Sequence, residues 1–458
     1  MKSPKLKIVY PILLVFLVLQ SCSNDDASQI DDDTIIQTNR TMELIKDWNT
    51  LWLDLDQATN GMRPNSTARA LAYIHLAGYE TAVADMASYT SNRNRLQGFN
   101  INPDERSENV NLDLALNTAY ALVFDHFMFY LAPNAQAGIS ILHNEKETEL
   151  STGLSQQEIE SSVDWGTYVA QQVIAYSQTD NQAEAQIIDQ TPESFVPPVG
   201  DGLWEPVDGE VAWFPYWGEV RTFVISPNET LSIAPPFVYS HDEFSDYYAK
   251  MNEVNTIATA ARLEDNEDLW IAEFWSDDVE GLMMSPPGRQ FSIAVQLVEQ
   301  AELGYEKTLE LFLKLGFAMN DGVVSAWADK YTYNTERPST YIEQHINPDY
   351  VTNLARLVAI PNPSFPSYPS GHATFAGAAA GVFIDIFGGD SIHFLESTHE
   401  GRTEFRGSSR QFSSFSAMAE ENSYSRVLLG VHVQADSDEG LRLGYEVADA
   451  INNYNVFE

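Results

Sequence analysis

The stretch PSYPSGHATFAGAAAGVFIDIF, residues 366–387, carries the strongest structural signal in the chain. Its first part is rich in proline and serine, and its second part is a run of alanine, glycine and large apolar residues. A serine that directly precedes such a run is typical of the N-terminus of a helix. We therefore expect a helix over residues 370–387, with Ser370 and Gly371 in its first turn.

The start of this helix has the properties of an anion site. Free N–H groups and the helix dipole favour negative charge at a helix N-terminus. Gly371 lets its amide approach an anion without a side chain in the way. His372 follows directly and adds a group that can transfer protons near neutral pH.

Two further segments supply positive charge on either side of this stretch. Arginine presents a planar fork of donors and lysine a point charge, and both pair well with phosphate-like oxygens. Taken together, the three segments hold three cations, one hydroxyl, one glycine amide and two imidazoles, at Lys330, Arg337, Ser370, Gly371, His372, Arg426 and His432. This inventory fits a tetrahedral oxyanion.

The spacing within each segment predicts how these side chains meet. Lys330 and Arg337 are seven residues apart, near two helical turns, so both can lie on one face if the helix continues to Arg337. Pro338 would then end that helix. Arg426 and His432 are expected on another helix, over 416–434, and Asp436 is placed to orient the imidazole. A plain surface carboxylate at 436 would give the same pattern.

Helical periodicity dominates the rest of the chain. Apolar residues recur with a helical period over 42–58, 67–86, 112–130, 156–177, 245–263, 291–329 and 440–453, whereas strand-like alternation is sparse. Residues 180–240 are rich in Pro, Gly and Trp, which favours a long packed functional loop over a linker. We therefore predict an all-α catalytic domain over 41–458, built of helical bundles packed together, with the site core at 330–436.

The amino-acid composition indicates which kinds of binding partner the chain can have. With 458 residues, of which 44% are hydrophobic, the chain can bury a sizeable core. Its 25 Lys+Arg against 66 Asp+Glu give a formal net charge of −41. A surface this acidic repels nucleic acid, so no nucleic-acid partner is expected. The motif cations are a notable share of a scarce residue type.

The N-terminus is typical of an export signal. Three lysines precede an apolar run over 8–19 that is too short to span a bilayer comfortably. Leu19-Gln20-Ser21-Cys22 resembles a bacterial lipobox, and Cys22 is the only cysteine. We expect a signal peptide over 1–21 and an acidic flexible tether over 22–40. The protein would then be exported and held in the lipid bilayer of the outer membrane or cell surface through lipidated Cys22. The alternative is an uncleaved anchor helix.

Three motifs of this chain resemble the signature shared by type 2 phosphatidic acid phosphatases, bacterial acid phosphatases and vanadium-dependent haloperoxidases. They are Lys330-x6-Arg337-Pro338, Pro369-Ser370-Gly371-His372 and Ser425-Arg426-x5-His432-x3-Asp436. The stretch 271–277 with Pro286-Pro287-Gly288 is similar to the haloperoxidase branch. That branch consists of helical bundles without transmembrane helices.

Two aromatic positions favour the bacterial iodoperoxidase-like haloperoxidases. Trp327 and Phe365 stand where the chloroperoxidase-type and bacterial iodoperoxidase enzymes carry Trp and Phe. The resemblance places them beside the halide pocket, although aromatic residues at helix boundaries also pack in cores. The cofactor implied is vanadate (V5+), and the substrates implied are hydrogen peroxide and a halide.

The resemblance also implies a role for each site residue. His432 would be the axial vanadium ligand, and Asp436 would orient it. His372 would be the acid–base group that accepts a proton from peroxide, and Lys330 would polarise the peroxide. The vanadate oxygens would be held by Lys330, Arg337, Ser370, Gly371 and Arg426. Asp277 or Asp278 is expected to pair with an arginine of the site.

A second reading of the same pocket is a soluble acid phosphatase. In that case His432 would attack phosphorus and His372 would protonate the leaving group. Vanadate mimics a phosphoryl transition state, so vanadate binding alone does not separate the two activities. Within the haloperoxidase reading, iodide is the expected halide because it needs the weakest oxidant. Bromide is the second choice, and the sequence leaves bromide and chloride open.

Overall fold

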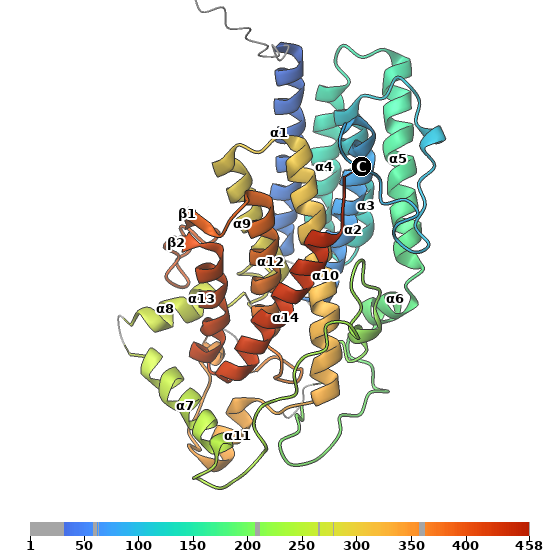
Figure 1. Cartoon of the computed structure of the whole chain (residues 1–458). Coiled ribbons are helices and arrows are strands. Elements are labelled where there is room, and N and C mark those ends of the chain that lie inside the picture. The colour runs from blue at the N-terminus through green and yellow to red at the C-terminus, as the bar shows by residue number, and fades with distance from the viewer. Residues whose placement is uncertain are drawn as a thin grey trace, which may run out of the picture.

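The structure of the chain is a computed structural model that describes residues 32–457, except for 58–61, 63, 207–210, 264–265, 278 and 357–361. This part contains 14 α-helices and one two-stranded antiparallel sheet (Figure 1). The predicted all-α class, with helical bundles packed together, is confirmed. Among the described helices, none has the length and apolar character needed to cross a membrane.

The first bundle consists of α1 to α5, drawn in blue to green in Figure 1. Its central helix is α2, in which every residue is buried, so apolar and small side chains are found on all of its faces. A capping box between Ser155 and Glu158 fixes the start of α5. The bounds are α1 Asp32–Asp56, α2 Asn65–Ala82, α3 Leu112–Phe127, α4 Pro133–Leu150 and α5 Gln156–Gln178.

The second bundle is built around α12 and α14, with α9, α10 and α13 beside them. The two central helices touch closely, because a Cβ at Gly444 would clash with the carbonyl of Thr374. The short helices α7, α8 and α11 lie at one end (Figure 1). The bounds are α7 Asp246–Ala261, α8 Glu267–Phe274, α9 Pro286–Ala301, α10 Tyr305–Tyr333, α11 Pro338–His345, α12 Gly371–Phe387, α13 Phe415–Leu428 and α14 Gln434–Asn453.

Helix α10 joins the two bundles. It is 29 residues long and packs on α2 of the first bundle and on α12 and α14 of the second. A Cβ at Gly316 would lie 2.9 Å from the Cα of Ala72, so the backbones of α10 and α2 are in direct contact. The C-terminal turns of α10 deliver Trp327 and Lys330 to the same region as the start of α12.

Two expected boundaries differ from the structure. The helix expected over 291–329 is two helices, because Glu302 adopts a left-handed conformation (φ 50°) that ends α9, and α10 begins after Gly304. The tether expected over 22–40 is also too long, since residues 32–40 already form the first turns of α1. The expected signal peptide and Cys22 lie outside the described residues.

The segment over 180–240 begins with a short helix, α6 (Asn181–Ile188), and its described remainder is irregular apart from one 3-10 turn. It is packed on the protein, since Trp204, Phe214 and Trp217 are all buried. The single hairpin consists of β1 (Ser391–Glu396) and β2 (Arg410–Ser414), and it lies between α12 and α13 in the chain.

Candidate active site

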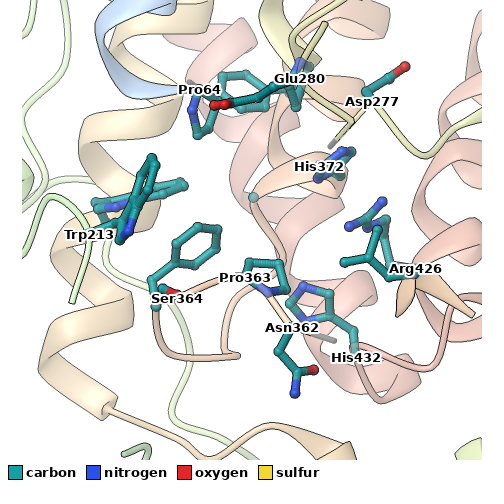
Figure 2. Close-up of a pocket in the computed structure, with 16 residues that line it drawn as sticks. Pro64, Trp213, Asp277, Glu280, Asn362, Pro363, Ser364, His372, Arg426 and His432 are labelled. Carbon is teal, nitrogen blue, oxygen red and sulfur yellow. The ribbon is translucent and has the colours of Figure 1, made fainter. Parts of the chain in front are cut away.

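A cavity of about 330 Å³ lies where the N-terminus of α12 meets α13 and the loop that follows it. Figure 2 shows that its walls differ in chemistry. His372, Arg426 and His432 lie on one side, and Trp213 lies across the cavity from them. Trp327 and Phe365 also line it. A cationic, imidazole-bearing wall therefore faces an aromatic wall.

The described structure brings the predicted site residues together in two layers. Six of them line the cavity: Trp327, Phe365, Gly371, His372, Arg426 and His432. The remaining four, Lys330, Arg337, Ser370 and Asp436, lie directly behind these and hold them or the adjoining loops through hydrogen bonds.

Lys330 anchors the loop that leads into α12. Its side chain is fully buried, and Nζ donates to the carbonyl oxygens of Pro366, Ser367 and Pro369 at 3.0, 2.9 and 2.5 Å. An ammonium has three N–H donors, so these bonds use all of them. Burial, followed by the neighbouring Arg337 guanidinium, holds the pKa of Lys330 well below its usual value.

Arg337 reaches the site from a separate helix. Asn334, in a left-handed conformation (φ 48°), ends α10 after Tyr333, and Arg337 is the N-cap of α11. The expectation that one helix carries Lys330 and Arg337 is therefore wrong. Pro338 starts α11 and ends no helix, because its fixed φ and missing N–H suit a first helical position. Arg337 donates to the carbonyls of Phe365 and Val431.

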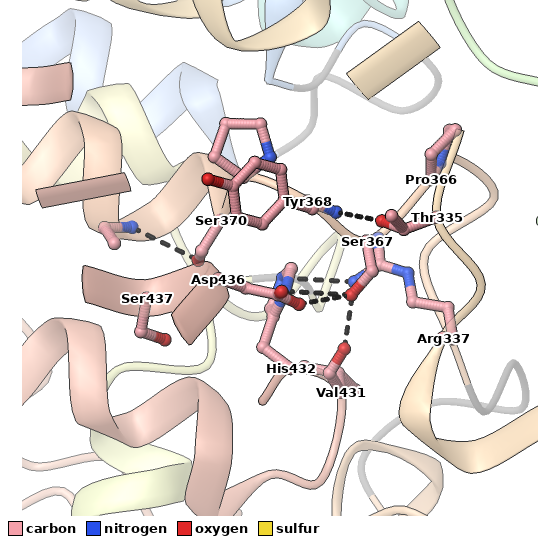
Figure 3. Close-up of polar contacts among 12 residues, drawn as sticks. Thr335, Arg337, Pro366, Ser367, Tyr368, Ser370, Val431, His432, Asp436 and Ser437 are labelled. Atoms are coloured by element: carbon pink, nitrogen blue, oxygen red, sulfur yellow. Dashed lines mark hydrogen bonds and ion pairs between the residues drawn. The ribbon is translucent and has the colours of Figure 1, made fainter. Parts of the chain in front are cut away.

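His432 is held between two partners that fix its tautomer (Figure 3). Its Nδ1 lies 3.0 Å from Asp436 Oδ2, and its Nε2 lies 3.1 Å from Arg337 Nη1. Arginine can only donate, so Nε2 accepts, and the ring proton is on Nδ1, directed at the carboxylate. Burial and the cations Arg337 and Lys330 hold the pKa of His432 well below its usual value. The ring is therefore neutral, and its unprotonated Nε2 accepts a hydrogen bond from the Arg337 guanidinium.

Ser367 completes the support of this imidazole. Its hydroxyl donates to Asp436 Oδ2 at 2.6 Å and lies 3.2 Å from His432 Nδ1. Burial raises the pKa of Asp436, whereas the Ser367 hydrogen bond and the cations Lys330 and Arg337 oppose that rise. The role expected of Asp436 as the orienting carboxylate agrees with this contact.

His432 lies on a loop and not on the helix expected over 416–434. Helix α13 ends at Leu428, and Gly430 turns the chain with a positive φ of 78° before α14 begins at Gln434. This turn points the imidazole back toward α13, so that Arg426 and His432 line the same cavity.

The helix expected to begin at Ser370 and Gly371 is present as α12. Ser370 is the N-cap, and its hydroxyl accepts from Ala373 N at 3.5 Å, a weak bond. A Cβ at Gly371 would lie 3.2 Å from the Trp327 ring, so a side chain there would crowd the cavity. Trp327 and Phe365 pack with ring centroids 4.8 Å apart, and Lys330 Nζ lies within 5.6 Å of both centroids.

Arg426 is buried and donates from Nη1 to the carbonyl of Ser276 at 3.2 Å. The next residue, Asp277, lines the cavity and pairs with Arg289 of α9, at 3.3 Å. Arg289 was not among the residues expected in the site. Asp278, the other carboxylate considered, lies outside the described residues.

Comparisons with known proteins agree with this architecture. Residues 310–456 match the family model of the VCPO second helical-bundle domain. The structure is similar to that of the first bacterial vanadium-dependent iodoperoxidase, with a TM-score of 0.76, 23% identity and coverage of 92% of this chain and 97% of that one. The chain has the fold of the vanadium haloperoxidases.

Two further proteins are similar to this chain, one in structure and one in sequence. A holo-type bacterial vanadium-dependent chloroperoxidase aligns with a TM-score of 0.66 and 17% identity, over 86% of this chain and 93% of that one. The vanadium chloroperoxidase of Curvularia inaequalis is 24% identical over 187 residues. That match covers 36% of this chain and only 31% of the relative's length.

The cavity is also lined by residues that the sequence analysis did not predict. Trp213 comes from the Pro/Gly/Trp-rich segment, whose composition was the only signal for it. Its backbone is fixed by Tyr331, whose hydroxyl donates to Trp213 O at 2.7 Å, and by Ser364, whose carbonyl accepts from Trp213 N at 3.0 Å. Pro286 and Phe375 lie in stretches that the sequence analysis quoted without assigning them to the site, and no sequence pattern marked the other missed lining residues, which are Pro64, Glu280, Leu354, Asn362, Pro363 and Ser364.

Proposed function

We propose that this protein is a vanadate-dependent haloperoxidase that oxidises a halide, with iodide as the first choice and bromide as the second, using hydrogen peroxide. One observation carries the proposal. His432 lines a cavity together with Arg426 and the N-terminus of α12, and its unprotonated Nε2 is hydrogen-bonded to an arginine, which an oxyanion bound there could engage in its place. A neutral imidazole nitrogen is a metal ligand, and the surrounding donors suit an oxyanion.

The residues present fit vanadate. His432 Nε2 would be the ligand atom, and the oxygens would be held by the Gly371 amide and Arg426, with Arg337 behind them as a further positive charge. Asp436 and Ser367 fix the ring from behind, which is the support that metal-bound histidines need. When bound, vanadate supplies Lewis-acid activation of hydrogen peroxide without a change in its own oxidation state.

His372 is placed to handle the proton of peroxide. It lines the cavity on the same wall as Arg426 and His432, at the second position of α12. A histidine there can accept a proton from an incoming peroxide and return it to the departing oxygen.

The aromatic wall supports a halide site. Trp327 and Phe365 have their rings near the buried ammonium of Lys330, which places positive charge behind an apolar surface. A large, weakly hydrated halide loses little hydration free energy when it binds against such a surface. Iodide also needs the weakest oxidant, which is why it is the proposed substrate.

The test uses the purified chain from Asp25 onward. Bound metal is first removed from the protein, and vanadate is then added. Oxidation of iodide, bromide and chloride by hydrogen peroxide is followed beside hydrolysis of a phosphate ester without peroxide. We expect vanadate-dependent iodide oxidation that is lost in His432→Ala. Phosphate-ester hydrolysis without any halide oxidation would favour the acid phosphatase alternative, in which the same His432 Nε2 is the nucleophile. Absence of both activities would refute the proposal.

We also propose, from the sequence alone, that the chain is exported and anchored through a lipid on Cys22. Mass spectrometry of the mature N-terminus tests this proposal. A diacylglyceryl group on Cys22 is expected, and an unmodified chain beginning at Met1 would contradict it.

A further inference from the structure

A buried ion-pair cluster lies directly behind the cavity wall. Arg289 of α9 donates from Nη2 to Glu396 at 2.8 Å and from Nη1 to Asp277 at 3.3 Å. The three side chains are at most 1% exposed. On the other side of Asp277, His399 Nε2 lies 3.6 Å from the same carboxylate oxygen.

The cluster is built with more contacts than an incidental ion pair. The guanidinium of Arg289 lies over the rings of Phe274 and Trp275, at 4.6 and 4.8 Å from their centroids. Glu396 also accepts hydrogen bonds from the backbone and hydroxyl of Thr398. Buried charges are costly even when paired, so a buried pair alone is weak evidence for a role in stability. The alternative to a role in stability is that the cluster fixes the position of the chain segment that contains Asp277.

The segment that the cluster holds is part of the active site. Asp277 lines the cavity, and its backbone is in the left-handed region (φ 44°), which aspartate and asparagine adopt more readily than other residues with a Cβ. The preceding carbonyl, that of Ser276, accepts the hydrogen bond from Arg426. A tight turn therefore lies between Arg289 on one side and Arg426 on the other.

We propose that Arg289 is a positioning residue of the oxyanion site: its ion pair with Asp277 fixes the turn at 276–277, and the Ser276 carbonyl of that turn holds Arg426 toward the anion. Arg289 itself does not line the cavity. The inference rests on the oxyanion pocket of the proposed function. It does not require halide oxidation, since phosphate would be held by the same cations.

The decisive variant keeps the charge and changes the geometry. In Arg289→Lys the ammonium remains cationic, but a point charge cannot bridge two carboxylates and stack on two rings as the guanidinium does. Vanadate affinity of the metal-free protein is measured by isothermal titration calorimetry without peroxide, with phosphate as a second probe. We expect binding weaker by about ten-fold, the scale of effects from groups that support a ligand shell. Arg289→Met should weaken binding at least as much.

The control is the same substitution in the first bundle. Arg69 is also buried, pairs with Glu184 at 2.8 Å and lies 5.1 Å from the Tyr73 ring centroid. Arg69→Lys should lower the melting temperature while leaving vanadate affinity unchanged. If Arg289→Lys lowers only the melting temperature, the residue is purely structural and the inference is overturned. If Arg289→Lys binds normally and only Arg289→Met is weak, charge alone explains the effect and the inference again fails.

A second variant covers the case in which the arginine variants do not fold. Asp277→Asn keeps the shape of the side chain, and asparagine tolerates the left-handed conformation. Removing a negative charge from the wall of an anion pocket would by itself strengthen vanadate binding. Weakening the contact with Arg289 should instead reduce the affinity. Tighter binding in Asp277→Asn would therefore refute the positioning role, and weaker binding would support it.

Discussion

The contact between Asp436 and His432 gives the sharpest prediction. In the native chain the carboxylate accepts a hydrogen bond from Nδ1–H, which leaves Nε2 unprotonated and able to accept from Arg337. Asp436→Asn replaces this acceptor with an amide of the same shape. The amide can donate to Nδ1, and the ring proton would then move to Nε2 and displace the hydrogen bond from Arg337 Nη1. The atom proposed to bind vanadium would lose its lone pair.

The size of the effect follows from what is lost. Asp436 Oδ2 accepts two hydrogen bonds, at 3.0 Å from His432 and at 2.6 Å from Ser367, and both are stronger for a carboxylate than for an amide. Loss of a carboxylate partner behind a metal-bound histidine typically lowers metal affinity about 10–100-fold, which corresponds to ~1.4–2.7 kcal/mol. We expect vanadate affinity to fall within this range.

Calorimetric titration of the metal-free protein with vanadate measures the change, and ¹⁵N NMR of the imidazole reports the tautomer. Asp438→Asn is a matched control, because it is the same substitution on α14 at an exposed position. Unchanged affinity in Asp436→Asn, or a ring proton that stays on Nδ1 while affinity falls, would refute the tautomer argument.

Three further predictions concern two site residues, His372 and Lys330, and the buried carboxylate of Glu336, which precedes Arg337 in the chain and accepts a hydrogen bond from Tyr247. His372→Ala should lower turnover by ~10²–10⁴-fold while vanadate affinity stays within a few-fold of the native value; normal peroxide turnover would exclude the acid–base role. Lys330→Met leaves three buried carbonyl oxygens without their donor and should lower the free energy of unfolding by ~1–3 kcal/mol, read from chemical denaturation. Burial raises the pKa of Glu336 from 4.5 to about 7, so the folded state holds a proton that the unfolded state releases. Its stabilising effect is present below pH 4.5 and is lost as the pH rises through 7, and Glu336→Gln should flatten the pH dependence of the melting temperature over that range.

The sequence was most informative where a local pattern determines local structure. The helical periods and the serine before the Ala/Gly run predicted the all-α class and the start of α12, because both depend on residues close in the chain. The breaks at Glu302 and Asn334 were not predictable in this way. Each is a left-handed residue that is not glycine, so the residue type that most often marks a helix end is absent from the sequence at both positions.

Within the site, the motifs predicted which residues lie close together. They did not predict which of these residues line the cavity and which lie behind it. Arg337 contacts His432 across 95 positions of sequence, and Lys330 donates to the 366–369 loop and not toward an open cavity. Such contacts are set by where the helices end. Trp213 and Arg289 were missed because each enters through an element outside the three motifs.

The contact between α10 and α2 has a consequence for how the chain can be divided. The matched family domain starts at residue 310, inside α10, yet the Gly316 backbone of that helix rests on Ala72 of the first bundle. A fragment cut at this boundary would expose to water an apolar helix face that normally lies against the other half. The two bundles should therefore melt in a single transition, and the isolated second bundle should aggregate even though it contains every cation and both imidazoles of the site.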